Sequence, residues 1–164
     1  MGVRKTAFAK IGNMRYEEII EGFRALTASD FDYGNVDARG WERLDELTNE
    51  LLNMPNAQAA IPELFDVMER LPDSELGSPG SLVHTLEKLP GYEQELVRSV
   101  RRRPAILSVW MINRILNAKL SDDQRRMYIE LLSEAASHSN APETVRDDAR
   151  RFIEFQAQKS NSNH

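Results

Sequence analysis

The stretch AILSVWMINRILNA, residues 105–118, decides the fold of this chain. Its apolar residues fall on nearly every side of a helix, and a helix of that kind is buried among other helices. Two polar residues, Asn113 and Arg114, interrupt the apolar pattern, and buried polar groups need hydrogen-bond partners. We therefore predict that residues 105–118 form the buried centre of the fold.

Arg114 is expected to pair with an acidic side chain on a neighbouring helix. Glu87, Glu93 and Glu95 are the candidates that precede it in the chain. Such a pair would belong to an internal polar clamp between helices, and Asn113 is expected to contribute to the same clamp. A role in binding a partner is the alternative for both residues.

Apolar residues recur every three or four positions along the flanking segments, which is typical of amphipathic helices. Four prolines fall at the boundaries of these segments, and they are spaced 17, 18 and 14 residues apart: Pro55, Pro72, Pro90 and Pro104. That spacing favours an all-α fold of helical hairpins stacked in a HEAT-like array, with an irregular orthogonal bundle as the alternative. The eight predicted helices span residues 16–26, 38–53, 58–70, 79–88, 92–102, 105–118, 122–138 and 143–158.

Several residues carry signals for the start of a helix. Asp37 is predicted to cap the second helix, Pro79 to take the first helical position of the fourth, and Ser121 to cap the seventh. Residues 1–14 show no helical period and residues 160–164 are polar. We expect a single α-helical domain over the 164-residue chain, with a loosely ordered arm at one end and a disordered tail at the other.

The composition excludes several classes of protein. The chain has 164 residues and no cysteine, which excludes disulfides and thiolate chemistry. It has no apolar run of about 20 residues, the length that spans a membrane. No apolar signal-peptide segment follows the basic residues near its start. We therefore expect a cytoplasmic protein that has no membrane partner.

Charge is distributed unevenly along the chain. The net charge is −5, but residues 17–76 carry 15 acidic and 4 basic side chains, a net of −11. A block of this kind disfavours nucleic acid as a partner and favours a cationic partner. A solvated acidic face that only aids solubility is the alternative.

No arrangement of residues predicts catalysis or metal binding. His84 is expected to make a structural hydrogen bond at the edge of the core, and three scattered histidines without cysteine do not predict a metal site. The adjacent acids at 122–123 and 147–148 diverge by about 100° on a helix, so they suit caps and exposed faces. The basic run at 101–103 is short and lacks interleaved aromatic residues, so it does not predict nucleic-acid binding. We expect a protein that is not an enzyme and holds no cofactor.

Two motifs stand near the middle of the chain, LGSPGxLVHxLE at residues 76–87 and VWMxNRILN at residues 109–117. Together they resemble an all-helical group of bacterial immunity proteins. These proteins are encoded beside polymorphic toxins, including those of contact-dependent growth inhibition systems. The resemblance implies a cytoplasmic, non-enzymatic inhibitor that binds the toxin domain of its own system.

The resemblance gives the acidic block a possible function. Many toxins of these systems are nucleases with cationic substrate grooves, so carboxylates of the inhibitor would mimic the phosphates of the substrate. The motif residues Trp110, Asn113 and Arg114 are assigned to the scaffold. The residues predicted to bind the toxin are Asp30, Asp32, Tyr33, Asp37, Glu42, Asp45, Glu46, Glu69, Asp73 and Glu75, with Tyr33 as an aromatic anchor.

Two other functions stay open. A HEAT-like helical adaptor would bind a non-toxin cellular protein in a groove. A helical enzyme would use His84 with a neighbouring acid, and it is the least favoured of the three functions. The sequence does not determine the identity of the toxin or the oligomeric state.

Overall fold

The computed structural model describes residues 14–163, and these contain helices and no β-strand. The all-α prediction is confirmed. None of the described helices is long and apolar enough to cross a membrane. The elements are α1 (Tyr16–Ala25), the 3₁₀ helix η1 (Ala28–Phe31), α2 (Gly40–Leu52), the 3₁₀ helix η2 (Ala57–Ala60), α3 (Ile61–Arg70), α4 (Gly80–Lys88), α5 (Tyr92–Arg102), α6 (Ile106–Leu116), α7 (Asp122–Ala136) and α8 (Glu143–Asn161).

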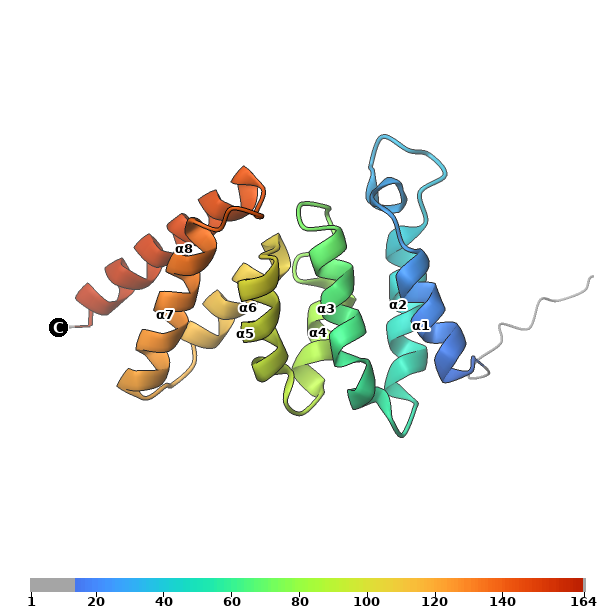
Figure 1. Ribbon diagram of the computed structural model, residues 1–164, viewed down its shortest axis with the longest axis horizontal. Coiled ribbons are helices and arrows are strands. Elements are labelled where there is room, and N and C mark those ends of the chain that lie inside the picture. Colours follow the sequence, from blue (N-terminus) through green and yellow to red (C-terminus); the bar gives the residue numbers. More distant parts are fainter. Residues whose placement is uncertain (1–13, 164) are drawn as a thin grey trace, which may run out of the picture.

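Consecutive helices pair into four hairpins that follow one another along the longest axis of the molecule (Figure 1). Helices α1, α3, α5 and α7 pack in sequence to form one layer. In the other layer, α2 packs on α4 and α6 packs on α8. This is the hairpin arrangement that the spacing of the prolines predicts.

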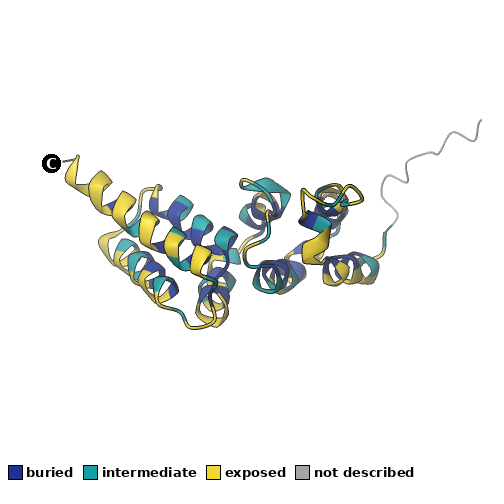
Figure 2. Cartoon of the chain, turned by 90° about the horizontal axis from the view of Figure 1, so that it is seen from above, coloured by how far each residue is buried: buried dark blue, intermediate teal, exposed yellow. Residues whose placement is uncertain are grey.

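The core is continuous between the two layers. The helices other than α6 each bury one apolar face, and Figure 2 shows buried faces turned toward neighbouring helices while much of α8 is exposed. Burial of one large side chain of this kind contributes about 1.5–3 kcal/mol. Fully buried members of the core include Ile19, Phe23, Leu47, Leu51, Leu64, Phe65, Met68, Leu82, Leu86, Leu96, Ile112, Leu131 and Val145.

Helix α6 has the central position that its composition predicts. It contacts α3, α5, α7 and α8, and residues on several of its sides are buried. Asn113 is 7% exposed, and its side-chain oxygen accepts a hydrogen bond of 2.8 Å from Nε2 of Gln156. Gln156 is itself 2% exposed and also donates to Asn117. The buried polar residue of α6 is therefore satisfied by a polar residue of α8.

Three predicted helix starts are wrong. The third helix begins at Ile61 rather than at residue 58, because Ala57–Ala60 form η2. Helix α2 begins at Gly40 rather than at Ala38, so Asp37 does not cap it. Two successive turns, Asn35 N to Asp32 O and Ala38 N to Asn35 O, hold the chain out of the helix until Gly40. Pro79 lies at the N-cap of α4, and Gly80 takes the first helical position instead.

The seventh helix starts as predicted, and the last helix runs longer than predicted. Ser121 caps α7, because its hydroxyl accepts a hydrogen bond of 3.2 Å from the backbone N–H of Gln124. Helix α8 extends to Asn161, two residues into the segment predicted as a tail. Gln, Ala and Lys at residues 156–159, directly before that segment, are good helix formers, and they carry the helix into it. Residues 1–13, which make up most of the predicted arm, and His164 lie outside the described residues.

The buried and exposed phenylalanines offer a test of the core. Phe65 is 0% exposed in α3, and Phe155 is 47% exposed in α8. We expect Phe65→Ala to lower the free energy of unfolding by about 3–5 kcal/mol, because it removes buried apolar surface and leaves a cavity. Phe155→Ala is the matched control, expected to change it by less than about 1 kcal/mol. Urea denaturation followed by circular dichroism measures both, and equal effects would contradict the described core.

Candidate protein-binding surface

The loop between α1 and α2 is ordered by its own acidic residues. The carboxylate of Asp30 accepts hydrogen bonds from the backbone N–H of Thr27 at 2.7 Å and from its hydroxyl at 2.9 Å. Asp32 accepts a bond of 2.8 Å from the backbone N–H of Gly34. The side-chain amide of Asn35 donates to Ser29 O at 3.1 Å. Asp30, predicted to bind a toxin, is thus half-buried and stabilises the loop.

Three aromatic side chains meet where this loop enters α2. Phe31 is buried and packs edge-on against Trp41, with ring centroids 5.8 Å apart. Tyr33 stacks on Trp41 with centroids 4.7 Å apart and an angle of 24° between the rings. Tyr33 nevertheless stays 78% exposed. The cluster therefore holds an exposed ring in one position, as an aromatic anchor requires.

Trp41 also joins two loops that are distant in sequence. Its indole N–H donates a hydrogen bond of 2.7 Å to the backbone carbonyl of Glu75, which lies between α3 and α4. Both loops lie at the same end of the hairpins (Figure 1). Trp41 is therefore half-buried and in contact with both loops.

Most of the predicted toxin-binding residues lie around this aromatic cluster. Asp45 is one helical turn after Trp41, and Glu42 is three residues before Asp45, so these side chains share a side of α2. We name as the acidic–aromatic surface the exposed or half-buried residues of this region: Asp32, Tyr33, Asp37, Trp41, Glu42, Asp45, Asp73 and Glu75.

Carboxylates dominate the charge of the acidic–aromatic surface. Glu42 has a loose ion pair with Arg39 at 3.8 Å, and both side chains are well exposed. Asp37, Asp45 and Asp73 make no side-chain ion pair with a described residue. The field of the surface is therefore negative, and it favours a cationic partner.

Two of the predicted residues are neutralised within the fold. Glu69 pairs with Arg102 at 2.6 Å, and its side chain is only 12% exposed. Glu46 pairs with Arg43 at 2.9 Å on α2. Arg102 also bonds to Glu95, and these carboxylates raise the pKa of its guanidinium further above the usual value. Glu69 thus joins α3 to α5 in this structure.

The basic run at 101–103 and His138 also have structural partners. Arg101 pairs with Glu134 of α7 at 3.2 Å. His138 accepts a hydrogen bond at Nδ1 from the backbone N–H of Asn140, so its Nε2 carries the proton and donates to Arg101 O at 2.8 Å. These contacts join the ends of α5 and α7.

His84 does not lie where the sequence pattern predicts. It is on the exposed side of α4, and its Nδ1 is 3.9 Å from the carboxylate of Glu87, too far for the expected hydrogen bond. The described residues include no cluster of three or more histidine, aspartate or glutamate side chains able to hold a metal ion.

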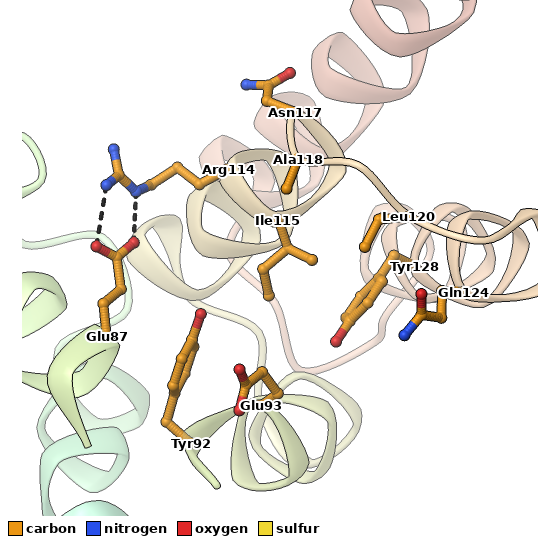
Figure 3. Close-up of a pocket in the computed structure, with 10 residues that line it drawn as sticks. All are labelled: Glu87, Tyr92, Glu93, Arg114, Ile115, Asn117, Ala118, Leu120, Gln124 and Tyr128. Carbon is orange, nitrogen blue, oxygen red and sulfur yellow. Dashed lines mark hydrogen bonds and ion pairs between the residues drawn. The ribbon is translucent and has the colours of Figure 1, made fainter. Parts of the chain in front are cut away.

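Arg114 pairs with Glu87, one of the three acids that the sequence offers as candidates. Two hydrogen bonds of 2.6 and 3.0 Å join the guanidinium to the carboxylate (Figure 3). They connect α6 to α4 and raise the pKa of Arg114 above its usual value. The pair forms one wall of a concave pocket of about 770 Å³ at the opposite end of the hairpins from the acidic–aromatic surface.

The close packing of the loop against α2 can be tested at two glycines. A Cβ atom at Gly40 would lie 2.5 Å from the backbone oxygen of Asp30, whereas one at Gly34 would meet only the side chain of Asp32, at 3.2 Å. We expect Gly40→Ala to displace the loop and to lower the free energy of unfolding by about 1–3 kcal/mol.

Gly34→Ala is the control, and its expected effect is below about 1 kcal/mol. Tryptophan fluorescence, measured in a Trp110→Phe background so that Trp41 is the one emitting tryptophan, reports the environment of Trp41 during urea denaturation of both variants. A Gly40→Ala protein with unchanged stability and fluorescence would contradict the described packing.

No family model, curated protein or solved structure matches this chain. The family resemblance of residues 76–117 therefore stays a prediction.

Proposed function

We propose that this protein is a cytoplasmic immunity protein that binds a cationic toxin domain, a nuclease in the leading case, through its acidic–aromatic surface and neutralises it. The observation that carries the proposal is Tyr33, a ring that is 78% exposed yet stacked on Trp41 among uncompensated carboxylates. Aromatic anchors dominate the energy of many protein interfaces. Surrounding charges set the association rate and the choice of partner.

The fixed position of Tyr33 supports a role in binding. The ring of Trp41 is held by the buried Phe31 on one side and by its hydrogen bond to Glu75 O. Tyr33 stacks on this fixed ring, so it loses little conformational freedom when a partner covers it.

The charge of the surface supports a cationic partner. Asp32, Asp37 and Asp45 lie in one loop and the following helix, where few basic side chains compensate them. A toxin that binds nucleic acid presents basic residues to phosphates, and carboxylates can occupy the same positions. Such complementarity raises association rates most strongly at low ionic strength.

The partners of the acidic pairs favour a non-enzymatic function. Asp123 pairs with Arg126 at 3.2 Å, and Asp147 pairs with Arg150 at 2.7 Å, each within its own helix. Exposed pairs of this spacing mainly support the helix. The proposal therefore assigns these residues to the scaffold and includes no catalytic step.

One observation favours the adaptor function as a second candidate. A groove of about 400 Å³ lies between the α3–α4 loop and helices α6 and α8, and Ile106, Trp110 and Phe152 line it. A groove with apolar walls next to an acidic loop could hold a peptide of a cellular protein. The two functions differ in whether the partner is toxic by itself.

A growth experiment tests the proposed function. Bacteria express the C-terminal domain of the protein that is encoded immediately upstream. They do so with or without the protein described here, and their growth is followed. We expect the domain to stop growth and this protein to restore it. A harmless upstream domain, or one that stays lethal without forming a complex, would overturn the assignment to that partner and favour the adaptor function.

Charge reversal locates the interface in the same experiment. We expect the double variant Asp37→Lys, Asp45→Lys to slow association with the toxin domain about tenfold or more at low ionic strength, because it reverses the field that attracts a cation. Both side chains are exposed and unpaired within the described chain. Stopped-flow fluorescence measures the association rate.

The control double variant is Glu130→Lys, Glu154→Lys, which changes the net charge equally at exposed positions of α7 and α8. We expect it to associate at nearly the normal rate and to restore growth. If both double variants behave alike, the interface is not the acidic–aromatic surface.

The aromatic anchor has its own test. We expect Tyr33→Ala to weaken binding of the toxin domain about 30-fold or more, since loss of a central anchor costs about 2 kcal/mol or more. Tyr33→Phe keeps the stacked ring and should keep most of the affinity. Isothermal titration calorimetry compares the three proteins, and equal affinities for all of them would exclude Tyr33 from the interface.

A further inference from the structure

The pocket beside the Glu87–Arg114 pair is separate from the acidic–aromatic surface. It is formed where α4 turns into α5 and where α6 leads to α7, at the other end of the hairpins (Figure 1). Its volume of about 770 Å³ falls in the range of small-ligand sites. Its walls combine polar groups with the apolar side chains of Ile115 and Leu120.

The first observation is an unused hydroxyl at the base of the pocket. Tyr128 of α7 is only 7% exposed, and its hydroxyl points into the pocket toward Tyr92 and Glu93 (Figure 3). It makes no hydrogen bond to any residue within 14–163. The hydroxyl oxygen is not sealed inside the protein, so its hydrogen-bonding capacity is open to a molecule that enters the pocket.

The second observation is the arrangement of oxygen atoms around this hydroxyl. Glu93 places its carboxylate between the rings of Tyr92 and Tyr128 (Figure 3). It makes no ion pair with a described residue, whereas Glu87 is already neutralised by Arg114. One carboxylate and two phenol oxygens therefore border the same space, and the charge left over in the pocket is negative.

Burial, together with this negative charge, raises the pKa of both tyrosines. Burial raises the pKa of Tyr92 to about 12, with further contributions from Glu93 and Glu87. Burial and Glu93 also raise the pKa of Tyr128. Both phenols are therefore neutral at physiological pH, and their oxygens can accept hydrogen bonds from a cation.

We infer that this pocket binds a primary ammonium group carried on an aliphatic stem, with Glu93 as its counter-ion and the hydroxyls of Tyr92 and Tyr128 as further acceptors. An ammonium group has three donors on a compact charge, which suits three separate oxygens better than the planar fork of a guanidinium. The apolar side chains of Ile115 and Leu120 would contact the stem. A carboxylate ligand is disfavoured, because Arg114 is engaged with Glu87 and Glu93 repels an anion.

Either a lysine side chain of a protein or a free alkylamine could supply this group. The inference is independent of the proposed immunity function, since it concerns other residues at the other end of the hairpins. Failure of the toxin experiment would therefore leave it standing, and its own failure would leave the acidic–aromatic surface unaffected.

The test is a titration of the full chain, followed by ¹H–¹⁵N correlation spectra. Three probes are used: Nα-acetyl-lysine N-methylamide, 1,5-diaminopentane, and Nα-acetyl-norleucine N-methylamide as a neutral analogue of the first. We expect saturable shifts of the resonances of Tyr92, Glu93 and Tyr128 with a millimolar dissociation constant for an ammonium probe, and none for the norleucine probe. Binding of the capped lysine assigns the site to a protein side chain, and binding of the diamine alone assigns it to a free amine.

Variants separate the site from general attraction to an acidic protein. Glu93→Gln should weaken binding about tenfold, because it removes the charge with little change of shape. Tyr128→Phe should weaken it severalfold without loss of stability, since its hydroxyl has no partner among residues 14–163. Glu42→Gln at the opposite end is the control and should bind normally. Absence of saturable shifts with both ammonium probes, equal shifts with norleucine, or unchanged binding by Glu93→Gln would overturn the inference.

Discussion

The fold depends on the removal of helix α6 from water. Its residues are apolar on nearly all sides, so a single partner helix could not cover it. Contacts with α3, α5, α7 and α8 provide the cover, and they require the hairpins on either side to lie close together. The same burial forces Asn113 to find a partner, which Gln156 of α8 supplies. Burial of one helix thus determines where the last hairpin is placed.

Ion pairs connect the helices at the edges of this core. Arg102 joins Glu69 of α3 to Glu95 of α5, and Arg114 joins α6 to Glu87 of α4. Partly exposed pairs of this kind contribute little free energy, but their fixed geometry keeps neighbouring hairpins in register. The glutamates in these pairs are neutralised, so they are not free to bind a partner, although the sequence alone does not distinguish them from unpaired carboxylates.

The two candidate sites follow from the geometry of stacked hairpins. Loops gather at the two ends of the hairpins, where backbone groups can reach water and side chains are free to vary. The acidic–aromatic surface lies at one end, where Trp41 joins two loops through the carbonyl of Glu75. The pocket of Tyr92 and Tyr128 lies at the other end. The rigid helices between them hold both sites in position.

The sequence by itself determined the helical class, the approximate limits of the helices, the central place of α6 and the need of Arg114 for an acidic partner on a neighbouring helix. These depend on local periodicity and on the cost of burying polar groups, which a single chain displays directly. Only the tertiary structure decided which carboxylates are free, because a residue such as Glu69 is engaged by Arg102, which folding brings near. The tertiary structure alone placed Trp41 between two loops and directed the hydroxyl of Tyr128 toward a pocket. The physical reason is that exposure and pairing depend on which helices pack together, and periodicity within one helix carries no information about its neighbours.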